Sequence, residues 1–472
     1  MAQEQENDSR FAIVATLLAF GLVGGISLLL WALTGRVDRA VLLQSSGGLS
    51  LDETLPESVR ARVSSGGKTL FDSESEAKEE GVAAIAQRNY ASAVTVFNAA
   101  LDENPNDPET FIYRSNARIG EDNAVVIVVV APAGEASPIG LEILRGAAQA
   151  QDDINRAGGV DGVPVRLVLV NDGNDPETAK TIAENLAEDP TVLGVVGHYS
   201  SDVTLATAPI YEAGELVSIT PVSTAVDLSG ISPYLYRTVP SDSFAAAALA
   251  AYMLYYREDR SVSVFYDSED RLSGSLKDEF GSFVSAWGGD ILEEYDLSGG
   301  GFDATELVDA DESDVLMLAA SPDTLEAAAE VIEACANARP VLGGDEIYYR
   351  YILEEAGAEA QALTVAVPWH LLSRDTDTDF AESSRDLWKG DVSWRTATAY
   401  DAVRAIAAGL TGDASREGLK ASLDDNNFSV DSATGKINFL PSGDRRQVDR
   451  LVQVEAGTRS GTGYDFVPFT LD

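Results

Sequence analysis

Short apolar runs alternate with longer amphipathic stretches from Val125 onward, and this alternation limits the fold more than any other feature of the chain. The first run, VVIVVV, covers residues 125–130, and VRLVLV covers residues 165–170. Uninterrupted apolar runs of this length are typical of strands buried on both faces, and the stretches between them have helical length. The pattern predicts an α/β fold built from parallel strand–helix–strand units. Further strands are expected in residues 192–197, 216–220, 262–266, 291–295, 315–320 and 340–344.

The strand–helix pattern is completed once and then repeats, which predicts two doubly wound parallel-sheet lobes. The length of 472 residues and a hydrophobic content of 45% suit two or three folded units rather than one. Asp and Glu number 77 against 33 Lys and Arg, so the formal charge is −44. Such a charge repels nucleic acids and anionic lipids, and it indicates a solvated, soluble surface. Nucleic acid is therefore not an expected partner.

Cysteine and histidine are too scarce for several kinds of site. Cys335 is the only cysteine, which excludes an intramolecular disulfide and a cysteine metal cluster. His198 and His370 are the only histidines, so zinc and iron sites would lack their usual nitrogen ligands. No metal or cofactor is expected.

An uncharged apolar run of 23 residues, Phe11 to Leu33, follows an acidic tail at residues 1–10. As a helix it would cross a hydrocarbon layer of roughly 30 Å. The acidic tail, the length of the run and the lack of an A-x-A site favour an uncleaved transmembrane anchor, placed at residues 11–34, over a cleaved signal peptide. The basic residues that follow the run would put the C-terminal part in the cytoplasm, but long domains often cross the membrane regardless of flanking charge.

Two segments separate the anchor from the α/β part. Residues 35–75 are rich in Ser, Gly and charge and are interpreted as a linker. Residues 76–120 have small and apolar residues at helical spacing, with a break at Arg88 and Asn89. They resemble about one and a half tetratricopeptide repeats, whereas such repeats normally stack in threes or more. A helical spacer packed on the main domain is the alternative.

The residues just after each strand should carry the site, because ligands bind beyond the carboxyl ends of parallel strands. After Val196 the chain reads GHYSSDVT, which places Ser200 and Ser201 at a helix start where free N–H groups can hold a carboxylate. An ordinary N-cap is the alternative for Ser201. Ser223 and Thr224 occupy a similar place in TPVSTAVD.

An acidic residue follows a strand in the second lobe. After Leu342 the chain reads GGDEIYY, and Asp345 is expected to pair with an ammonium group. A helix cap is the alternative function of Asp345.

Several of these segments together resemble a known family. GLEILRGAAQAQDDINRAGGVDGVPVRLVLVNDGNDPETA, GHYSSDVTLATAPIYEAGELVSITPVST and ATAYDAVRAIAAGL are similar to the leucine/isoleucine/valine-binding proteins of the type I periplasmic binding protein class. The likeness runs from about Val125 to the C-terminus, and residues 81–120 look like cyanobacterial members.

The resemblance implies roles for individual residues. Ser201 and Thr224, assisted by the Val222 carbonyl, would hold the α-carboxylate of an amino acid, and Asp345 would hold its ammonium group. Leu272 stands where relatives have an aromatic residue, as do Ile139 and Ser321. Trp369 is expected as a replacement wall, with a core or hinge position as the alternative. The expected ligand-binding set is Ser200, Ser201, Val222, Ser223, Thr224, Leu272, Asp345 and Trp369.

The resemblance also implies that the binding domain, residues 121–472, crosses between lobes three times. Lobe 1 would comprise about 123–242 and 369–445, and lobe 2 about 243–368 and 446–472. Ligand contacts from both lobes would drive hinge closure.

The chain is expected not to be an enzyme, because it has no G-x-S-x-G, H-E-x-x-H or dinucleotide G-x-G-x-x-G motif. The resemblance implies an extracytoplasmic, membrane-anchored binding protein that captures an amino acid or related amide and delivers it to an ABC permease. A ligand sensor acting through a separate partner, and an adaptor with a degenerate binding domain, are the alternatives.

Overall fold

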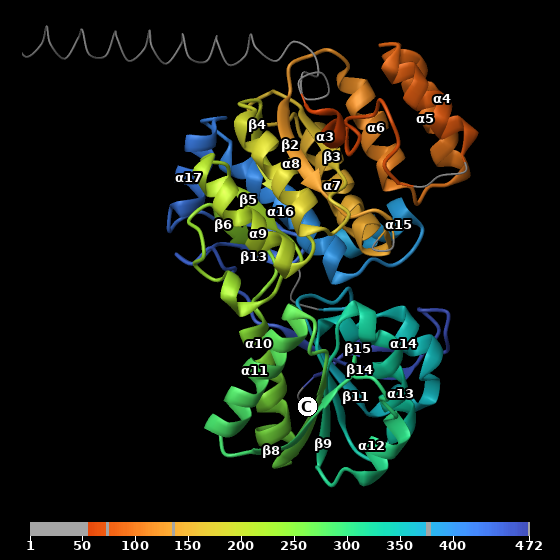
Figure 1. Ribbon diagram of the computed structural model, residues 1–472. Coiled ribbons are helices and arrows are strands. Elements are labelled where there is room, and N and C mark those ends of the chain that lie inside the picture. Colours follow the sequence, from red (N-terminus) through yellow and green to blue (C-terminus); the bar gives the residue numbers. More distant parts are fainter. Residues whose placement is uncertain (1–54, 72–74, 135–136, 374–378, 471–472) are drawn as a thin grey trace, which may run out of the picture. The chain divides into compact units, whose positions relative to one another are not determined.

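Two largely parallel sheets organise the described part of this computed structural model, residues 55–71, 75–134, 137–373 and 379–470 (Figure 1). The helices and strands belong to one compact unit, residues 51–120 and 124–472. The two lobes named below each contain one sheet. The predicted α/β class with two parallel-sheet lobes is confirmed.

The sheet of lobe 1 has the strand order β1-β3-β2-β4-β5-β6. All neighbours pair in parallel except β1, which pairs antiparallel with β3. The order therefore reverses between β2 and β4, as in doubly wound sheets. The strands are β1 (Val63–Ser64), β2 (Val125–Val130), β3 (Val165–Val170), β4 (Val192–Val196), β5 (Ser218–Thr220) and β6 (Leu235–Arg237).

Helices cover both faces of this sheet, which explains the uninterrupted apolar runs. In β2, Val128 and Val130 pack in the cluster that contains residues of α8 and α9, whereas Ile127 and Val129 pack with α7 and α16. Side chains along a strand alternate between faces, so every position of β2 must be apolar. The helices of lobe 1 are α7 (Ser137–Arg156), α8 (Pro176–Glu188), α9 (Ser201–Ala213), α15 (Phe380–Trp388), α16 (Trp394–Gly409) and α17 (Arg416–Asp424).

The sheet of lobe 2 has the order β15-β14-β11-β10-β9-β7-β8. Five strands repeat the parallel order of lobe 1, and β14 and β15 extend the sheet antiparallel. The strands are β7 (Ser261–Tyr266), β8 (Asp290–Asp296), β9 (Val315–Ala319), β10 (Val341–Gly343), β11 (Leu363–Val367), β14 (Arg450–Ala456) and β15 (Tyr464–Pro468), and β12 (Val430–Ser432) and β13 (Gly435–Ile437) form a separate hairpin.

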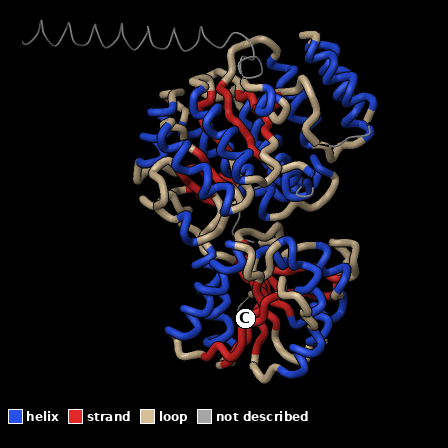
Figure 2. The backbone as a smooth tube through the Cα atoms, in the orientation of Figure 1, coloured by secondary structure: helices blue, strands red, loops and turns tan. Residues whose placement is uncertain are grey.

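Figure 1 shows α10 and α11 on one side of the lobe 2 sheet and α12, α13 and α14 on the other, and in Figure 2 the strands lie between these helices. Trp369 to Arg445 return to lobe 1 between β11 and β14, so the chain passes between the lobes three times. The helices are α10 (Asp242–Ala251), continued by a π-helix (Tyr252–Arg257), α11 (Arg271–Ala286), α12 (Ala304–Ala310), α13 (Leu325–Cys335) and α14 (Arg350–Glu355).

The segment before β2 is more ordered than a linker. Part of the expected 35–75 linker forms α3 (Glu57–Arg60) and strand β1, which differs from the prediction. Leu55, Val59 and Val63 join the apolar cluster of lobe 1, and three apolar residues are too few to give a sustained period. Residues 76–120 contain α4 (Glu76–Ala86), α5 (Tyr90–Glu103) and α6 (Pro108–Ile119), with the turn between α4 and α5 at the expected place.

Helix α6 is attached to lobe 1 by buried hydrogen bonds. The Asn116 amide donates to the Leu167 carbonyl at 2.7 Å and accepts from Gln151 at 2.9 Å. These contacts support the packed spacer, and the tetratricopeptide interpretation stays a prediction. The predicted anchor at residues 11–34 lies outside the described residues, and no helix among those described is long and apolar enough to cross a membrane.

The contact between α7 and α16 depends on a missing side chain. A Cβ atom on Gly146 would lie 2.1 Å from the Thr396 carbonyl oxygen, which belongs to the backbone of α16 and cannot rotate away. We predict that Gly146→Ala lowers the free energy of unfolding by about 1–3 kcal/mol, measured by urea denaturation of the purified chain.

Gly281→Ala is the matched control. Gly281 also lies inside a helix, and its nearest contact for a new Cβ is 4.0 Å away. The control should be neutral or stabilising by up to about 1 kcal/mol, because alanine favours helix. Equal effects of the two substitutions would contradict the packing described.

Candidate binding site between the lobes

A small cavity lies between the carboxyl ends of strands from both lobes. Its volume is about 40 Å³, enough for a few water molecules but less than an amino acid occupies. Lobe 1 contributes residues after β4 and β5, and lobe 2 contributes the start of α11 and the turn after β10. The lining residues are Tyr199, Ser200, Ser201, Asp202, Val222, Ser223, Asp270, Arg271, Leu272, Pro322 and Glu346.

The hydroxyl groups after β4 and β5 have different functions. Ser200 is the N-cap of α9, and its Oγ accepts from the Val203 N–H. Ser201 is the first helical residue, so the capping alternative applies to Ser200 instead. Ser223 joins the two loops, because its Oγ donates to the Tyr199 carbonyl at 2.9 Å and lies 2.8 Å from the Thr204 hydroxyl.

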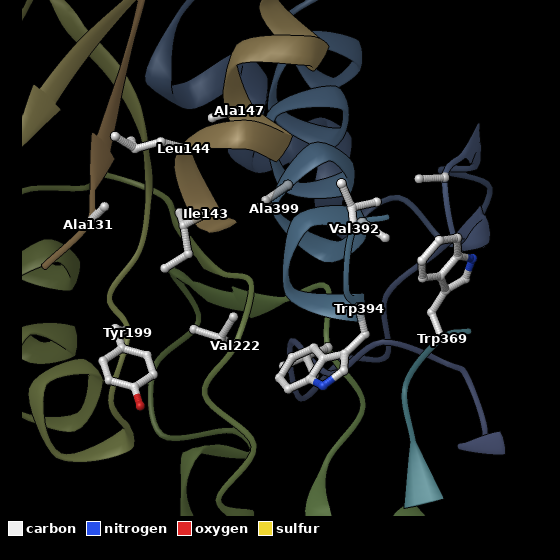
Figure 3. Packing of buried hydrophobic residues seen from close by; sticks show 14 of the residues in the cluster. Ala131, Ile143, Leu144, Ala147, Tyr199, Val222, Trp369, Val392, Trp394 and Ala399 are labelled. Atoms are coloured by element: carbon white, nitrogen blue, oxygen red, sulfur yellow. The ribbon is translucent and has the colours of Figure 1, made fainter. Parts of the chain in front are cut away.

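Aromatic and aliphatic groups line part of the site. Tyr199 and Val222 are buried and line the cavity. In Figure 3 the Tyr199 hydroxyl and the Trp394 indole nitrogen point the same way, away from Ile143. Trp369 lies on the opposite side of this cluster from Tyr199, where it packs edge-on against Phe380.

Trp369 does not line the cavity and packs in the hydrophobic core, which agrees with the alternative interpretation; contact of Trp369 with a ligand stays a prediction. Leu272, by contrast, lines the cavity from α11.

A buried ion pair links the lobes beside the cavity. Arg395 Nη2, in the first turn of α16, lies 2.7 Å from Glu346 Oε2, in the turn after β10. Glu346 lines the cavity and is 7% exposed, and Arg395 is fully buried. Burial alone would lower the pKa of Arg395, but the carboxylates of Glu346 and Glu142 raise it, so the guanidinium stays charged. Breaking one side of such a pair leaves an uncompensated buried charge.

Thr224 and Asp345 occupy a second, neighbouring cavity of about 10 Å³. Asp242 and Asp449 line it as well, so three carboxyl groups meet there. Burial raises the pKa of Asp345 well above its ordinary value, and the nearby Glu346 raises it further. Burial also raises the pKa of Asp242 to about 6 and that of Asp449 to about 8.

The structure thus divides the predicted site residues between the two cavities. Ser201 and Val222 face the first cavity, and Thr224 and Asp345 face the second. Asp345 does not cap a helix, because Gly344 is the N-cap of its short 3₁₀ turn and no side chain caps it. Glu346, which sequence reasoning missed, is the acidic residue of that turn that faces Ser201 across the first cavity. A three-residue turn has no sequence periodicity, so the sequence does not indicate which of the adjacent residues Asp345 and Glu346 faces the cavity.

A larger groove of about 580 Å³ adjoins the first cavity and shares Asp202, Asp270 and Arg271 with it. Arg271, from lobe 2, pairs with Asp202 and with Asp227 of lobe 1, the latter at 2.6 Å. The Val226 N–H also donates across the lobes to Ser275 at 3.0 Å. The acidic residues of the groove are Asp202, Asp227, Glu269, Asp270, Asp278 and Glu279.

The arrangement suits binding of a small polar solute. Lobe 1 offers hydroxyl groups and the N-terminus of α9, which favour a carboxylate, and lobe 2 offers a carboxylate, which favours an ammonium group. Within the described ranges no group of three or more His, Cys, Asp or Glu residues could hold a metal ion.

Comparison with known families decides the class of this fold. A model of the family described as periplasmic binding protein matches residues 126–460, more than half of the chain. The chain belongs to the periplasmic binding protein family. Its predicted likeness to the leucine/isoleucine/valine-binding proteins is confirmed, whereas the likeness to cyanobacterial members stays a prediction.

Curated relatives carry names of binding proteins. An amino acid binding protein of Pseudomonas aeruginosa is 31% identical over 148 residues, which cover 31% of this chain and 39% of the relative. A Leu/Ile/Val-binding protein of Rhizobium johnstonii is 26% identical over 71% of this chain and 92% of the relative. The match thus spans about two fifths of the Pseudomonas relative and nearly all of the Rhizobium one.

Solved structures share the fold. The isoleucine complex of a branched-chain amino acid transporter substrate binding protein from Streptococcus pneumoniae superposes with a TM-score of 0.63 at 20% identity, covering 73% of this chain and 100% of the other. A putative branched-chain amino acid ABC transporter protein from Rhodospirillum rubrum gives a TM-score of 0.59 at 24% identity, covering 74% and 100%. None of these relatives or structures supports the sensor or adaptor hypotheses.

The raised pKa of Asp242 predicts a pH dependence of stability. Between about pH 4 and pH 6 the folded state binds a proton at Asp242 that the unfolded state has lost, so this group's contribution to the free energy of unfolding falls as pH rises through that window. Asp242→Asn lacks this effect. The free energy of unfolding of the variant, relative to that of wild type, should therefore increase from pH 4 to pH 6 by up to about 3 kcal/mol. Urea denaturation at each pH measures it.

Asp175→Asn provides a control of opposite sign. Hydrogen bonds from Thr178 lower the pKa of Asp175, an exposed N-cap, so its contribution to stability is present above its unfolded pKa and lost toward low pH. Parallel pH profiles for wild type and Asp242→Asn would contradict the assignment.

Proposed function

We propose that this protein is an extracytoplasmic solute-binding protein that captures an amino acid between its two lobes and delivers it to an ABC-type permease. The observation that carries the proposal is the cavity lined jointly by Ser201 and Val222 of lobe 1 and by Leu272 and Glu346 of lobe 2. A ligand that contacts both lobes stabilises the closed arrangement, which is how two-lobed binding proteins respond to solute. Family membership and the names of the relatives support the same function.

In this proposal the α-carboxylate of the amino acid is held at the start of α9. Ser201 donates its hydroxyl, the free N–H groups of the first turn add theirs, and the Val222 carbonyl at the neighbouring strand end assists. The cavity of about 40 Å³ has to enlarge to admit the ligand, so binding is coupled to relative movement of the lobes. Thr224 lines the second cavity and joins the site only after such a movement.

The ammonium group is held by the turn after β10, where Asp345 and Glu346 are the candidates. Glu346 lines the same cavity as Ser201 and lies in an ion pair with Arg395. Asp345 lines the second cavity, where burial raises its pKa. The raised pKa favours the neutral carboxyl group, which is a weaker partner for a cation. Geometry and charge therefore favour Glu346 over the Asp345 expected from sequence.

The apolar segment Phe11–Leu33 is proposed to tether the domain outside the cytoplasm. A tether keeps a binding protein near its permease and raises its effective concentration there. Protease treatment of intact cells would digest the domain under this proposal, and a protected domain would contradict it.

Isothermal titration of the full-length chain in mild detergent with a panel of amino acids tests the site. We predict that Ser201→Ala weakens binding about 10–100-fold, the loss expected for one hydrogen bond to a charged group. Glu346→Gln should weaken it by a similar or larger factor, because the ammonium group loses its counter-charge.

Asp345→Asn is the matched control for Glu346→Gln, since it makes the same chemical change one residue away. A small effect of Asp345→Asn beside a large one of Glu346→Gln supports the assignment, and the reverse order would restore Asp345 as the ammonium ligand. Absence of binding by any amino acid to wild type would refute the proposed function.

A further inference from the structure

Arg395 has hydrogen-bond donors that the protein leaves unused. Its Nη2 bonds Glu346, but Nε and Nη1 have no acceptor among the residues that the structure describes, although the side chain is fully buried. The indole Nε1 of Trp394, whose ring lies 4.5 Å from the Arg395 guanidinium carbon, also has no acceptor there. Buried donors in folded proteins are nearly always bonded, so three in the first turn of one helix require an explanation.

Arg395 is separated from the cavity proposed to hold the ligand by one side chain, that of Glu346. Glu346, the partner of Arg395, lines that cavity, and so does Tyr199. The charges of Glu346 and Arg395 both act on the Tyr199 hydroxyl, although burial is the main cause of its raised pKa. A solute that enters between Tyr199 and Glu346, with the Arg395–Glu346 pair kept, therefore comes within reach of Arg395.

The charge of Arg395 is already balanced inside the protein. Glu346 pairs with it directly, and Glu142 also acts on the guanidinium, so these two carboxylates together balance Arg395 and the ligand ammonium group. The free N–H groups of Arg395 therefore need an acceptor oxygen but no further negative charge. A neutral carbonyl oxygen meets this need, whereas a second carboxylate would add an unbalanced charge in a buried place.

The groove that leads to the cavity disfavours anionic solutes as well. Among the described residues that line it, six are carboxylates and one is a cation, Arg271, which pairs with two of those carboxylates. A negative approach of this kind repels a solute with net negative charge and admits neutral or zwitterionic ones.

We propose that Arg395 sets the ligand class: the bound amino acid carries a neutral carbonyl oxygen at the end of its side chain, as an amide does, and Nε and Nη1 of Arg395 donate to it. This inference rests on the proposed function, because it assumes an amino acid between the lobes. Glu346 keeps Oε2 on Arg395 and offers Oε1 to the ligand ammonium. An aliphatic side chain in the same place leaves the two donors unbonded.

Titration of the full-length chain with glutamine, glutamate and leucine tests the inference. Glutamine should bind at least about tenfold more tightly than leucine. Its side-chain carbonyl accepts two hydrogen bonds from the charged Arg395, whereas leucine accepts none. Equal affinities for leucine and glutamine would overturn the inference while leaving the proposed function intact. Glutamate binding more tightly than glutamine would overturn the neutral-acceptor argument.

Two substitutions assign the preference to Arg395. Arg395→Met keeps the length of the side chain and removes its donors, so the glutamine preference should vanish. Arg395→Lys keeps the charge beside Glu346 and should fold even if the methionine variant does not, yet it lacks the planar fork of donors and should also lose most of the preference.

Arg404→Met, the same change on the same helix outside both cavities, should retain the preference. A preference that survives both Arg395 substitutions would overturn the inference. Failure of glutamine to bind wild type while another amino acid binds would also overturn the inference. Failure of every amino acid of the panel to bind wild type would instead refute the proposed function, so the two failures are distinct.

Discussion

The parallel direction of the strands in both lobes determines where this molecule can bind anything. Each lobe has five parallel strands in the same order, so the loops after β4, β5, β7 and β10 emerge at the carboxyl edges of their sheets. The cavity is lined from these loops and the helix starts that follow them. Helix N-termini point to the same edges and supply unpaired N–H groups. The site is thus a consequence of topology before any particular side chain is considered.

Ion pairs and buried carboxyl groups dominate the region where the two lobes meet. The Arg395–Glu346 pair is buried where the lobes meet, and a buried pair is costly to separate because each charge has lost its water. Arg271 makes a second, more exposed link through Asp202 and Asp227. Three carboxyl groups with raised pKa values gather in the second cavity beside the points where the chain crosses between lobes. Closure of the lobes is therefore expected to respond to both solute and pH.

Much of the fold could be predicted from sequence because buried parallel strands need apolar residues on both faces. The runs at residues 125–130 and 165–170 coincide with β2 and β3 for this reason. Strand β1, with two residues, and strand β6, with three, carry a much weaker signal and were not predicted. Short elements of this kind are stabilised by neighbours distant in the sequence, which a local pattern does not record.

The site was harder to predict because single-residue geometry decides it. The sequence indicated the turn after β10 but not that Glu346, rather than Asp345, faces Ser201. Trp369 was expected as a replacement wall because relatives have aromatic residues around the ligand; it packs against Phe380 and lines neither cavity, and its contact with a ligand stays a prediction. Arg395 gave no sequence signal, since an arginine at a helix start is usually solvated. Its importance follows only from complete burial beside Glu346.

The central claim is that one small solute contacts both lobes. Hydrogen–deuterium exchange of the full-length chain, with and without saturating amino acid, tests it most directly. The account predicts slower exchange in two segments, residues 199–203 after β4 and residues 345–347 after β10, with the same dependence on ligand concentration. Slowing in one lobe alone, or in neither with any amino acid, would contradict capture between the lobes.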